Sequence, residues 1–153
     1  MTIQSVTPFL WFDSQAEDAA KFYAALFPDS RILQVSHYGK NMPGPEGAVM
    51  VVDAQIAGQR VQLMNGGPSF TLNMAFSLMV ACEDQAEIDR LWAALLEGGQ
   101  AHACGWVTDR FGLTWQINYA GWPALLEKNA QKAMEAMMTM IKIDIQALKD
   151  AVA

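Results

Sequence analysis

The chain has few of the residues that would indicate a disulfide framework, a metal centre or a polyanion-binding surface. Of its 153 residues, two are cysteine and two are histidine, and ten Lys and Arg stand against sixteen Asp and Glu. Cys82 and Cys104 do not make a disulfide framework, and with His37 and His102 they show no metal-ligand spacing. We interpret both thiols as reduced and buried. The net charge of −6 disfavours contacts with a phosphate backbone, so no nucleic-acid partner is expected.

The sequence also lacks the segments that direct a chain to or through a membrane. No apolar run reaches about 18 residues, and no basic-then-apolar segment opens the chain. We therefore expect a soluble, cytoplasmic protein without membrane contact. Hydrophobic residues make up 52% of the chain and charged residues only 17%. The hydrophobic fraction is ample for a packed core. The low charged fraction indicates a sparsely charged surface, or a surface that is partly covered by another subunit.

What the chain does contain is one strand–helix–strand unit, present twice. The triplet Gln-Ala-Glu at 15–17 recurs at 85–87, and the apolar segment 22–26 recurs as 91–95. Two copies are too few for a solenoid. They are typical of a pseudo-symmetric domain whose halves share one core. We predict a single domain, with module 1 at about 5–66, module 2 at about 72–120 and a helical tail at 121–153.

Hydrophobic periodicity and turn residues predict the elements of the first module. A capping box at Ser14–Glu17 predicts the start of its helix, because the serine hydroxyl and the glutamate carboxylate can satisfy free backbone N–H groups. A turn at 57–59 joins the last two strands. The predicted elements are a strand at 6–12, a helix at 16–27, and strands at 31–38, 48–56 and 60–65.

The second module repeats this order and is followed by additional helices. Asp84 is predicted to cap its helix, with Glu87 in the box position, and Gly98–Gly99 to end it. The strands are predicted at 73–81, 101–108 and 113–119, with Asp109, Arg110 and Gly112 forming the turn between the last two. In the tail, Asn129 and Asp144 are predicted to cap helices that have no counterpart in the first module.

Two βαβββ halves in a chain of this size resemble the vicinal-oxygen-chelate superfamily, which has the glyoxalase/dioxygenase fold. The segments TPFLWFDSQAEDAAKFYAALFPDSRI, LMNGGPSF, CGWVTDRFGLTWQI and AMMTMIKIDIQALKDA resemble the PhnB-like family, often labelled 3-demethylubiquinone-9 3-methyltransferase. The resemblance covers nearly the whole chain. It implies an α+β fold in which the two modules form one cupped mixed sheet, with helices outside, a site inside and C-terminal helices added.

The resemblance also implies where a metal would bind. Metal-dependent members of the superfamily take His, Gln or Glu ligands from the first and last strands of each module. Those positions fall here near Pro8, near Ala75 or Phe76, and at Gln62 and Gln116. Two neutral amides would bind oxygen-preferring divalent cations poorly, so we expect no metal. No strand leads into a glycine-rich turn and helix, so we also expect no S-adenosylmethionine or other cofactor.

The candidate site follows from strand alternation and the expected cup. Alternation places side chains at 62 and 64 on one face, and those at 114, 116 and 118 on one face of the last strand. A neutral, amide-lined and partly aromatic pocket suits a small, weakly polar ligand. The same amides could instead bond to each other or to water and only fix the core. The predicted ligand-binding residues are Gln62, Met64, Asn65, Trp106, Gln116 and Asn118.

Three functions follow from these observations, and catalytic residues cannot be assigned among them. The first is binding of a small hydrophobic or aromatic molecule without a metal. The second is an enzyme acting on a small organic substrate, either metal-independent or with an atypical metal site. The third is the quinone-precursor methyltransferase that the family label names. His37 and His102 each lack a sequence-evident partner for catalysis, so whether the protein is an enzyme stays open.

The tail also predicts how the chain assembles. Met134, Met137, Met138 and Ile141 follow helical spacing and form one apolar stripe. The stripe must be buried against the same domain or against a second copy of the chain. Because two-fold dimers are the commonest assemblies, and Met fills imperfect gaps at such surfaces, we predict a homodimer to which the tail contributes.

Overall fold

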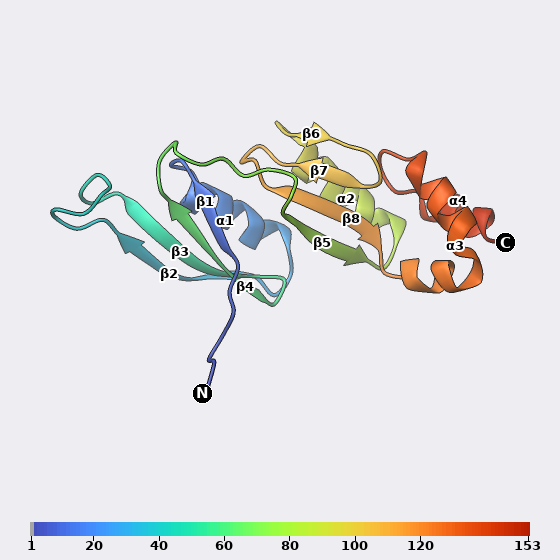
Figure 1. Ribbon diagram of the computed structural model, residues 1–153, viewed down its shortest axis with the longest axis horizontal. Helices are drawn as coiled ribbons and strands as arrows, with labels where there is room; N and C mark the ends of the chain where they lie inside the picture. The colour runs from blue at the N-terminus through green and yellow to red at the C-terminus, as the bar shows by residue number, and fades with distance from the viewer. Residues whose placement is uncertain (1) are drawn as a thin grey trace. The chain divides into compact units, whose positions relative to one another are not determined.

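The computed structural model describes residues 2–153 and divides the chain into two compact units. The first unit ends at Leu72 and the second runs from Asn73 to Ala153. The first contains β1 (Phe9–Phe12), α1 (Ala16–Leu26), β2 (Arg31–His37), β3 (Val49–Ile56) and β4 (Gln59–Asn65) (Figure 1). The second contains β5 (Ser77–Cys82), α2 (Gln85–Leu96), β6 (Gln100–Ala101), β7 (Trp106–Thr108), β8 (Thr114–Tyr119), α3 (Trp122–Met138) and α4 (Ile145–Ala151).

Both units contain a four-stranded mixed sheet of the same topology. The strand order is β1-β4-β3-β2 in the first sheet and β5-β8-β7-β6 in the second. In each, the first strand pairs in parallel with the last, and the remaining pairs are antiparallel. The predicted α+β fold of two βαβββ modules followed by C-terminal helices is confirmed. No helix among residues 2–153 is long and apolar enough to cross a membrane.

Each sheet has one face covered by its helix, which we call the helix face, and a second that we call the open face. In the first unit the buried side of α1, including Ala16, Ala20 and Tyr23, lies against alternate residues of the strands such as Val52 and Leu63. In the second unit α2 buries a stripe of four side chains against the helix face, which includes the fully buried core residues of β7 and β8. These four are Ile88, Leu91, Trp92 and Leu95.

The two module helices begin in different ways. Asp84 caps α2 as predicted, because its Oδ1 accepts the Glu87 N–H at 2.9 Å and the Glu87 carboxylate accepts the Glu83 N–H. The capping box predicted at Ser14–Glu17 is wrong. The N-cap of α1 is Gln15, which makes no side-chain cap bond. The Ala16 N–H instead donates to Asn65 Oδ1 at 2.8 Å, so a side chain remote in sequence caps this helix.

The single strand predicted at 101–108 is also wrong. It is two short antiparallel strands, β6 and β7, joined by a tight turn. Cys104 and Gly105 in this turn have φ of 61° and 79°, a left-handed conformation that short-range hydrophobic alternation does not reveal. The next turn, predicted from Asp109 to Gly112, is confirmed. Its Asp109 carboxylate accepts the N–H groups of Phe111 and Leu113 and, at 2.9 Å, the Trp115 indole N–H.

The C-terminal tail packs on the second unit. Helix α3 is kinked at Asn129, whose side chain accepts the Lys132 N–H, and Asp144 caps α4, both as predicted. Between the helices, the N–H groups of Cys104 and Gly105 donate to the carbonyls of Met140 and Ile141. Side chains from the tail complete the core of the unit, and Ile143, Leu148 and Ala133 are fully buried. The tail is therefore part of the second unit's own core.

Candidate functional site

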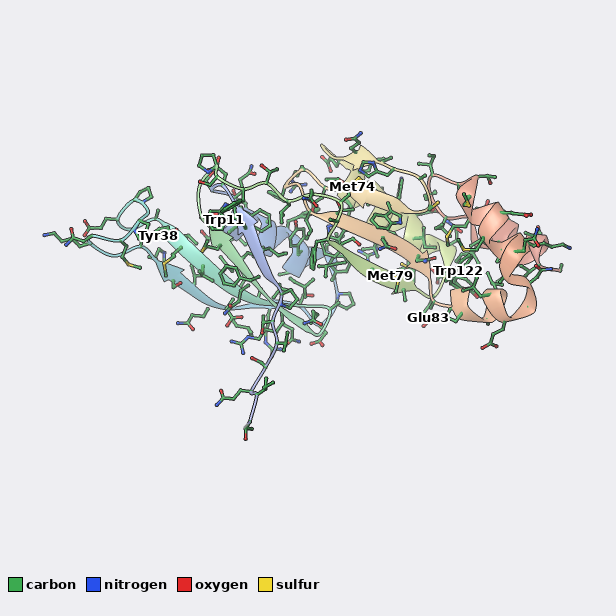
Figure 2. The ribbon with its side chains drawn as sticks, viewed as in Figure 1. Trp11, Tyr38, Met74, Met79, Glu83 and Trp122 are labelled. Carbon is green, nitrogen blue, oxygen red and sulfur yellow. The ribbon has the colours of Figure 1, made fainter. Side chains whose placement is uncertain are left out.

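The open face of the first sheet carries Gln62 and Met64 beside exposed aromatic side chains. Gln62 is in register with Phe9 on the edge strand β1, and Met64 is in register with Trp11. The Phe9 side chain is 52% exposed. Trp11, labelled in Figure 2, is fixed by its indole N–H, which donates to the Gly67 carbonyl at 2.9 Å, and its ring packs edge-on against the Phe70 ring. An amide and an accessible ring thus stand side by side on this face.

An ion pair that the sequence did not reveal lies next to Gln62. The Arg60 guanidinium donates two hydrogen bonds to the Asp53 carboxylate, at 3.0 and 2.5 Å. These bonds, opposed by burial, hold the pKa of Asp53 below its ordinary value, and the neighbouring Gln62 side chain acts in the same direction as Arg60. The predicted neutral face therefore carries a paired charge.

The open face of the second sheet repeats the first arrangement. Gln116 is in register with Met79 on the edge strand β5 and with Trp106 on β7. Its amide donates to the Ser77 hydroxyl at 2.8 Å. The Met79 side chain is 65% exposed and projects from β5 (Figure 2). Gln116 and Trp106, both predicted as ligand-binding residues, are brought together here, with Met79 as a neighbour that sequence reasoning missed.

A hydrogen-bonded polar row crosses the same open face. The His102 Nε2 lies 2.9 Å from Thr108 Oγ1, which lies 2.9 Å from the buried Thr114 hydroxyl. His102 therefore has the partner that its sequence neighbourhood did not provide. The Thr108 hydroxyl is hydrogen-bonded to both His102 and Thr114, so the orientation of the His102 ring is fixed. They do not place a carboxylate or a nucleophile on it, and they define no catalytic dyad.

The two asparagines of the predicted site lie in different settings. Asn118 shares the open face with Gln116, and its Oδ1 accepts the Tyr119 N–H. Asn65 alternates with Gln62 and Met64, so it lies on the helix face, opposite to them. Besides capping α1, its Nδ2 donates to the Val49 carbonyl at 3.2 Å. The expectation that Asn65 extends the amide-lined surface of Gln62 is corrected by this placement.

The residues at the superfamily's metal positions do not fit a divalent cation. The first-strand residues in register with Gln62 and Gln116 are Phe9 and Met79. The positions expected from the resemblance, near Pro8 and near Ala75 or Phe76, are therefore replaced by these two, and β5 begins only after Phe76. Neither side chain is a ligand for an oxygen-preferring ion. Within residues 2–153, no three His, Cys, Asp or Glu side chains gather in a way that could hold a metal. Metal-free binding therefore stays a prediction.

The thiols do not supply a nucleophile to this face. Cys82 is fully buried on the helix face, and burial, reinforced by the neighbouring Glu87 carboxylate, raises its pKa to about 12. A thiolate is therefore scarcely populated at neutral pH. Cys104 is only half-buried, in the β6–β7 turn, so the expectation that both thiols are buried is correct for Cys82 and wrong for Cys104.

The duplicated βαβββ topology, with a four-stranded mixed sheet in each unit, is a glyoxalase-type fold. Residues 4–118 match the family model described as 3-demethylubiquinone-9 3-methyltransferase. The chain is 34% identical to the PhnB protein of Bacillus cereus, with a TM-score of 0.70 over 76% of this chain and 100% of that one. The chain therefore belongs to the PhnB-like 3-demethylubiquinone-9 3-methyltransferase family.

More distant solved structures share the fold alone. Protein PA1353 from Pseudomonas aeruginosa is 21% identical, with a TM-score of 0.63 over 76% of this chain and 98% of that one. The fosfomycin resistance protein FosX from Listeria monocytogenes, in a complex with Mn(II), is 12% identical, with a TM-score of 0.54 over 78% of this chain and 94% of that one. No curated protein matches the chain.

Proposed function

We propose that this protein binds a small hydrophobic or aromatic molecule on the open faces of its sheets, through its own side chains and without a metal. The observation that carries the proposal is the repeated pairing of a glutamine with a large exposed apolar side chain. Gln62 stands beside Phe9, and Gln116 stands beside Met79. The repeat has kept this pairing in both units, although the surrounding residues differ.

The pairing has a simple physical use. Burying one large apolar side chain against a ligand contributes about 1.5–3 kcal/mol, and a neutral amide can donate and accept one hydrogen bond that fixes the orientation of a weakly polar group. In the second sheet Trp106 adds a ring beside Gln116. Carboxylates and cations, which would favour a strongly charged ligand, are paired with each other on the first sheet at Asp53 and Arg60.

Methyl transfer, the reaction in the family's name, receives no support from a specific feature of this chain. The turns that lead from β1 into α1 and from β5 into α2 contain no glycine (residues 13–15 and 83–84). Such strand-to-helix turns are where a glycine-rich loop would hold a nucleotide-type cofactor. We therefore expect the protein not to bind S-adenosylmethionine.

Thermal shift distinguishes metal-free aromatic binding from a metal-dependent enzyme and from the methyltransferase. We expect a panel of small neutral aromatics, such as indole and simple quinones, to raise the melting temperature, whereas Zn²⁺, Mn²⁺, Ni²⁺ and S-adenosylmethionine leave it unchanged. Stabilisation by a metal alone would contradict the proposal in favour of a metalloenzyme. Stabilisation by S-adenosylmethionine would favour the methyltransferase.

A variant pair then locates the binding surface. Gln116→Leu removes the amide on the second open face, and we expect it to weaken aromatic binding about fivefold, the equivalent of one hydrogen bond, without loss of the fold. Gln146→Leu, at an exposed position on α4 and outside both sheets, is the matched control and should bind as the native protein does. Equal affinities of the two variants for the aromatic ligand would show that Gln116 does not contact the ligand and has a structural role only.

We also propose that the protein forms a homodimer to which the tail contributes. Of the predicted stripe, Met137 is buried within the second unit, whereas Met134, Met138 and Ile141 stay 45%, 68% and 54% exposed. We expect Met138→Lys to lower the sedimentation mass from dimer to monomer at micromolar concentration. Gln131→Lys, exposed on the same helix and equal in charge change, is the control. A native protein that sediments as a monomer would overturn the proposal.

A further inference from the structure

A row of four side chains crosses the open face of the second sheet, from β5 to the end of β6. Met79 is in register with Gln116, and Gln116 with Trp106. The His102 N–H donates to the Trp106 carbonyl at 2.9 Å, which extends the pairing of β6 with β7 by one residue. Side chains at paired positions share one face of a sheet. We call Met79, Gln116, Trp106 and His102 the amide row.

A neighbouring row of hydroxyl side chains holds the amide row in place. Ser77 is in register with Thr114, and Thr114 with Thr108, and we call these residues the hydroxyl row. The Thr108 hydroxyl lies 2.9 Å from His102 Nε2 and 2.9 Å from the Thr114 hydroxyl. The Gln116 amide donates to the Ser77 hydroxyl at 2.8 Å. Both polar members of the amide row are therefore oriented by the protein itself, before any ligand arrives.

These hydrogen bonds use one end of each polar side chain and leave the other end unpaired. Gln116 donates through Nε2, and its Oε1 has no hydrogen-bond partner among residues 2–153. His102 bonds through Nε2, and within the same part of the chain its Nδ1 has no partner. No buried side-chain nitrogen or oxygen of the described residues lacks a partner, so both atoms are accessible. The amide row thus presents two oriented hydrogen-bonding atoms, with the half-buried Trp106 ring between them.

The spacing of these two side chains selects the length of a ligand. Gln116 and His102 lie on opposite sides of Trp106 in the row, and neighbouring strands are about 4.8 Å apart, so about 10 Å separates their backbones. A ring with a single hydroxyl cannot bond to both. A ring with hydroxyls at opposite ends can, with one hydrogen bond of about 2.8 Å at each end, while its face packs on the Trp106 indole in an offset stack.

We propose that His102 is a further ligand-binding residue, and that the second open face prefers aromatic rings with hydroxyls at opposite, para positions. Gln116 Oε1 accepts a hydrogen bond from one hydroxyl, and His102 Nδ1 bonds to the other. An imidazole nitrogen can donate or accept, and a hydroxyl matches either role. Met79, 65% exposed at the end of the row, covers the edge of the ring. This inference rests on the aromatic binding proposed above and narrows it to a class of ligand.

Two isomers of one formula test the preference. Hydroquinone carries its hydroxyls at opposite ends of the ring, and catechol carries them on adjacent carbons. We expect full-length protein to bind hydroquinone about fivefold more tightly than catechol in calorimetry under argon, the equivalent of one additional hydrogen bond. Equal affinities, or binding of indole without binding of either isomer, would overturn this inference and leave aromatic binding standing. If indole and both isomers fail to bind, the proposed function fails as well.

A matched pair of variants assigns the preference to His102. The chain has two histidines, and the other, His37, is exposed on the first unit. We expect His102→Leu to weaken the binding of hydroquinone about fivefold and to leave the binding of catechol unchanged. His37→Leu should change neither affinity. If His102→Leu weakens the binding of both isomers alike, His102 has a structural role only and the proposal is wrong.

The native protein gives a second measurement, which decides the matter if His102→Leu does not fold. Its two histidines give two imidazole Cε1–H signals in the NMR spectrum, and the one that remains in His37→Leu belongs to His102. Titration of the untagged native protein with hydroquinone should shift the His102 signal saturably and leave the His37 signal in place. An unchanged His102 signal, or equal shifts of both signals, would overturn the proposal.

Discussion

Replacing Asn65 by alanine is expected to destabilise the first unit by about 2 kcal/mol. The side chain accepts the Ala16 N–H at the start of α1, 2.8 Å away, and donates to the Val49 carbonyl, 3.2 Å away. Loss of a helix-capping acceptor costs about 1 kcal/mol, and loss of one partner of a part-buried hydrogen bond costs about 1 kcal/mol more. Asn65→Asp keeps the acceptor for the Ala16 N–H but places a carboxylate oxygen against the Val49 carbonyl, so it should retain the cap and still destabilise the unit.

Urea unfolding followed by tryptophan fluorescence measures this cost, and hydrogen exchange of the α1 amides shows whether the helix start is loosened. Ser14→Ala is the matched comparison, because the sequence predicts Ser14 as the cap whereas the structure gives that role to Asn65. We expect Ser14→Ala to change stability by less than about 0.5 kcal/mol. If Ser14→Ala costs more than Asn65→Ala, the capping assignment is wrong.

Two further outcomes follow from charge and burial. Arg60 holds the pKa of Asp53 below 3.8, so the folded carboxylate takes up a proton less readily than the unfolded one. The stability from this pair is present above pH 3.8 and is lost as pH falls through the folded pKa. Denaturation of Arg60→Met should therefore differ most from native near neutral pH and converge with it in acid, and a constant difference would contradict this. Cys82, with a pKa of about 12, should resist iodoacetamide in the native protein while Cys104 reacts. Equal rates would mean that Cys82 is accessible.

The sequence predicted the repeated module well, because local signals carry it. Asp84 followed by Glu87, the turn from Asp109 to Gly112 and the asparagine at 129 each act within a few residues of chain. The structure places them as expected. The failure at Ser14 has the opposite cause. The cap of α1 comes from Asn65, 49 residues away, and no local pattern records a contact of that range.

The candidate site divides in the same way. Strand alternation correctly put Gln62 with Met64, and Gln116 with Asn118. What lies beside each glutamine depends on strand pairing, so Phe9 and Met79 became visible only with the register of the edge strands. The Asp53–Arg60 pair was hidden for the same reason, since its two members come from neighbouring strands of a hairpin whose register the sequence leaves open.

The same limit applied to the turn at 104–105, where two residues adopt positive φ. The segment AHACGWVT is mostly apolar, with His102 and Thr108 as its polar residues, and only the backbone shows that it reverses. Hydrophobic pattern alone cannot distinguish a strand from a tight hairpin when the turn has no pair of residues that strongly favours it. This reversal brings Trp106 into register with Gln116 and so creates the ring beside the amide.

Methyl-labelled methionine provides the most direct test of the proposed ligand surface. The chain has ten methionines, of which Met79 and Met64 lie on open faces, whereas Met134 and Met138 lie exposed on the tail. Titration with indole should give saturable ring-current shifts at Met79 or Met64 and leave the two tail methyls unchanged, and Gln116→Leu should weaken the response at Met79. If the tail methyls shift as strongly as Met79, or if no methionine on an open face responds to any member of the aromatic panel, the account of this protein as a metal-free aromatic binder is contradicted.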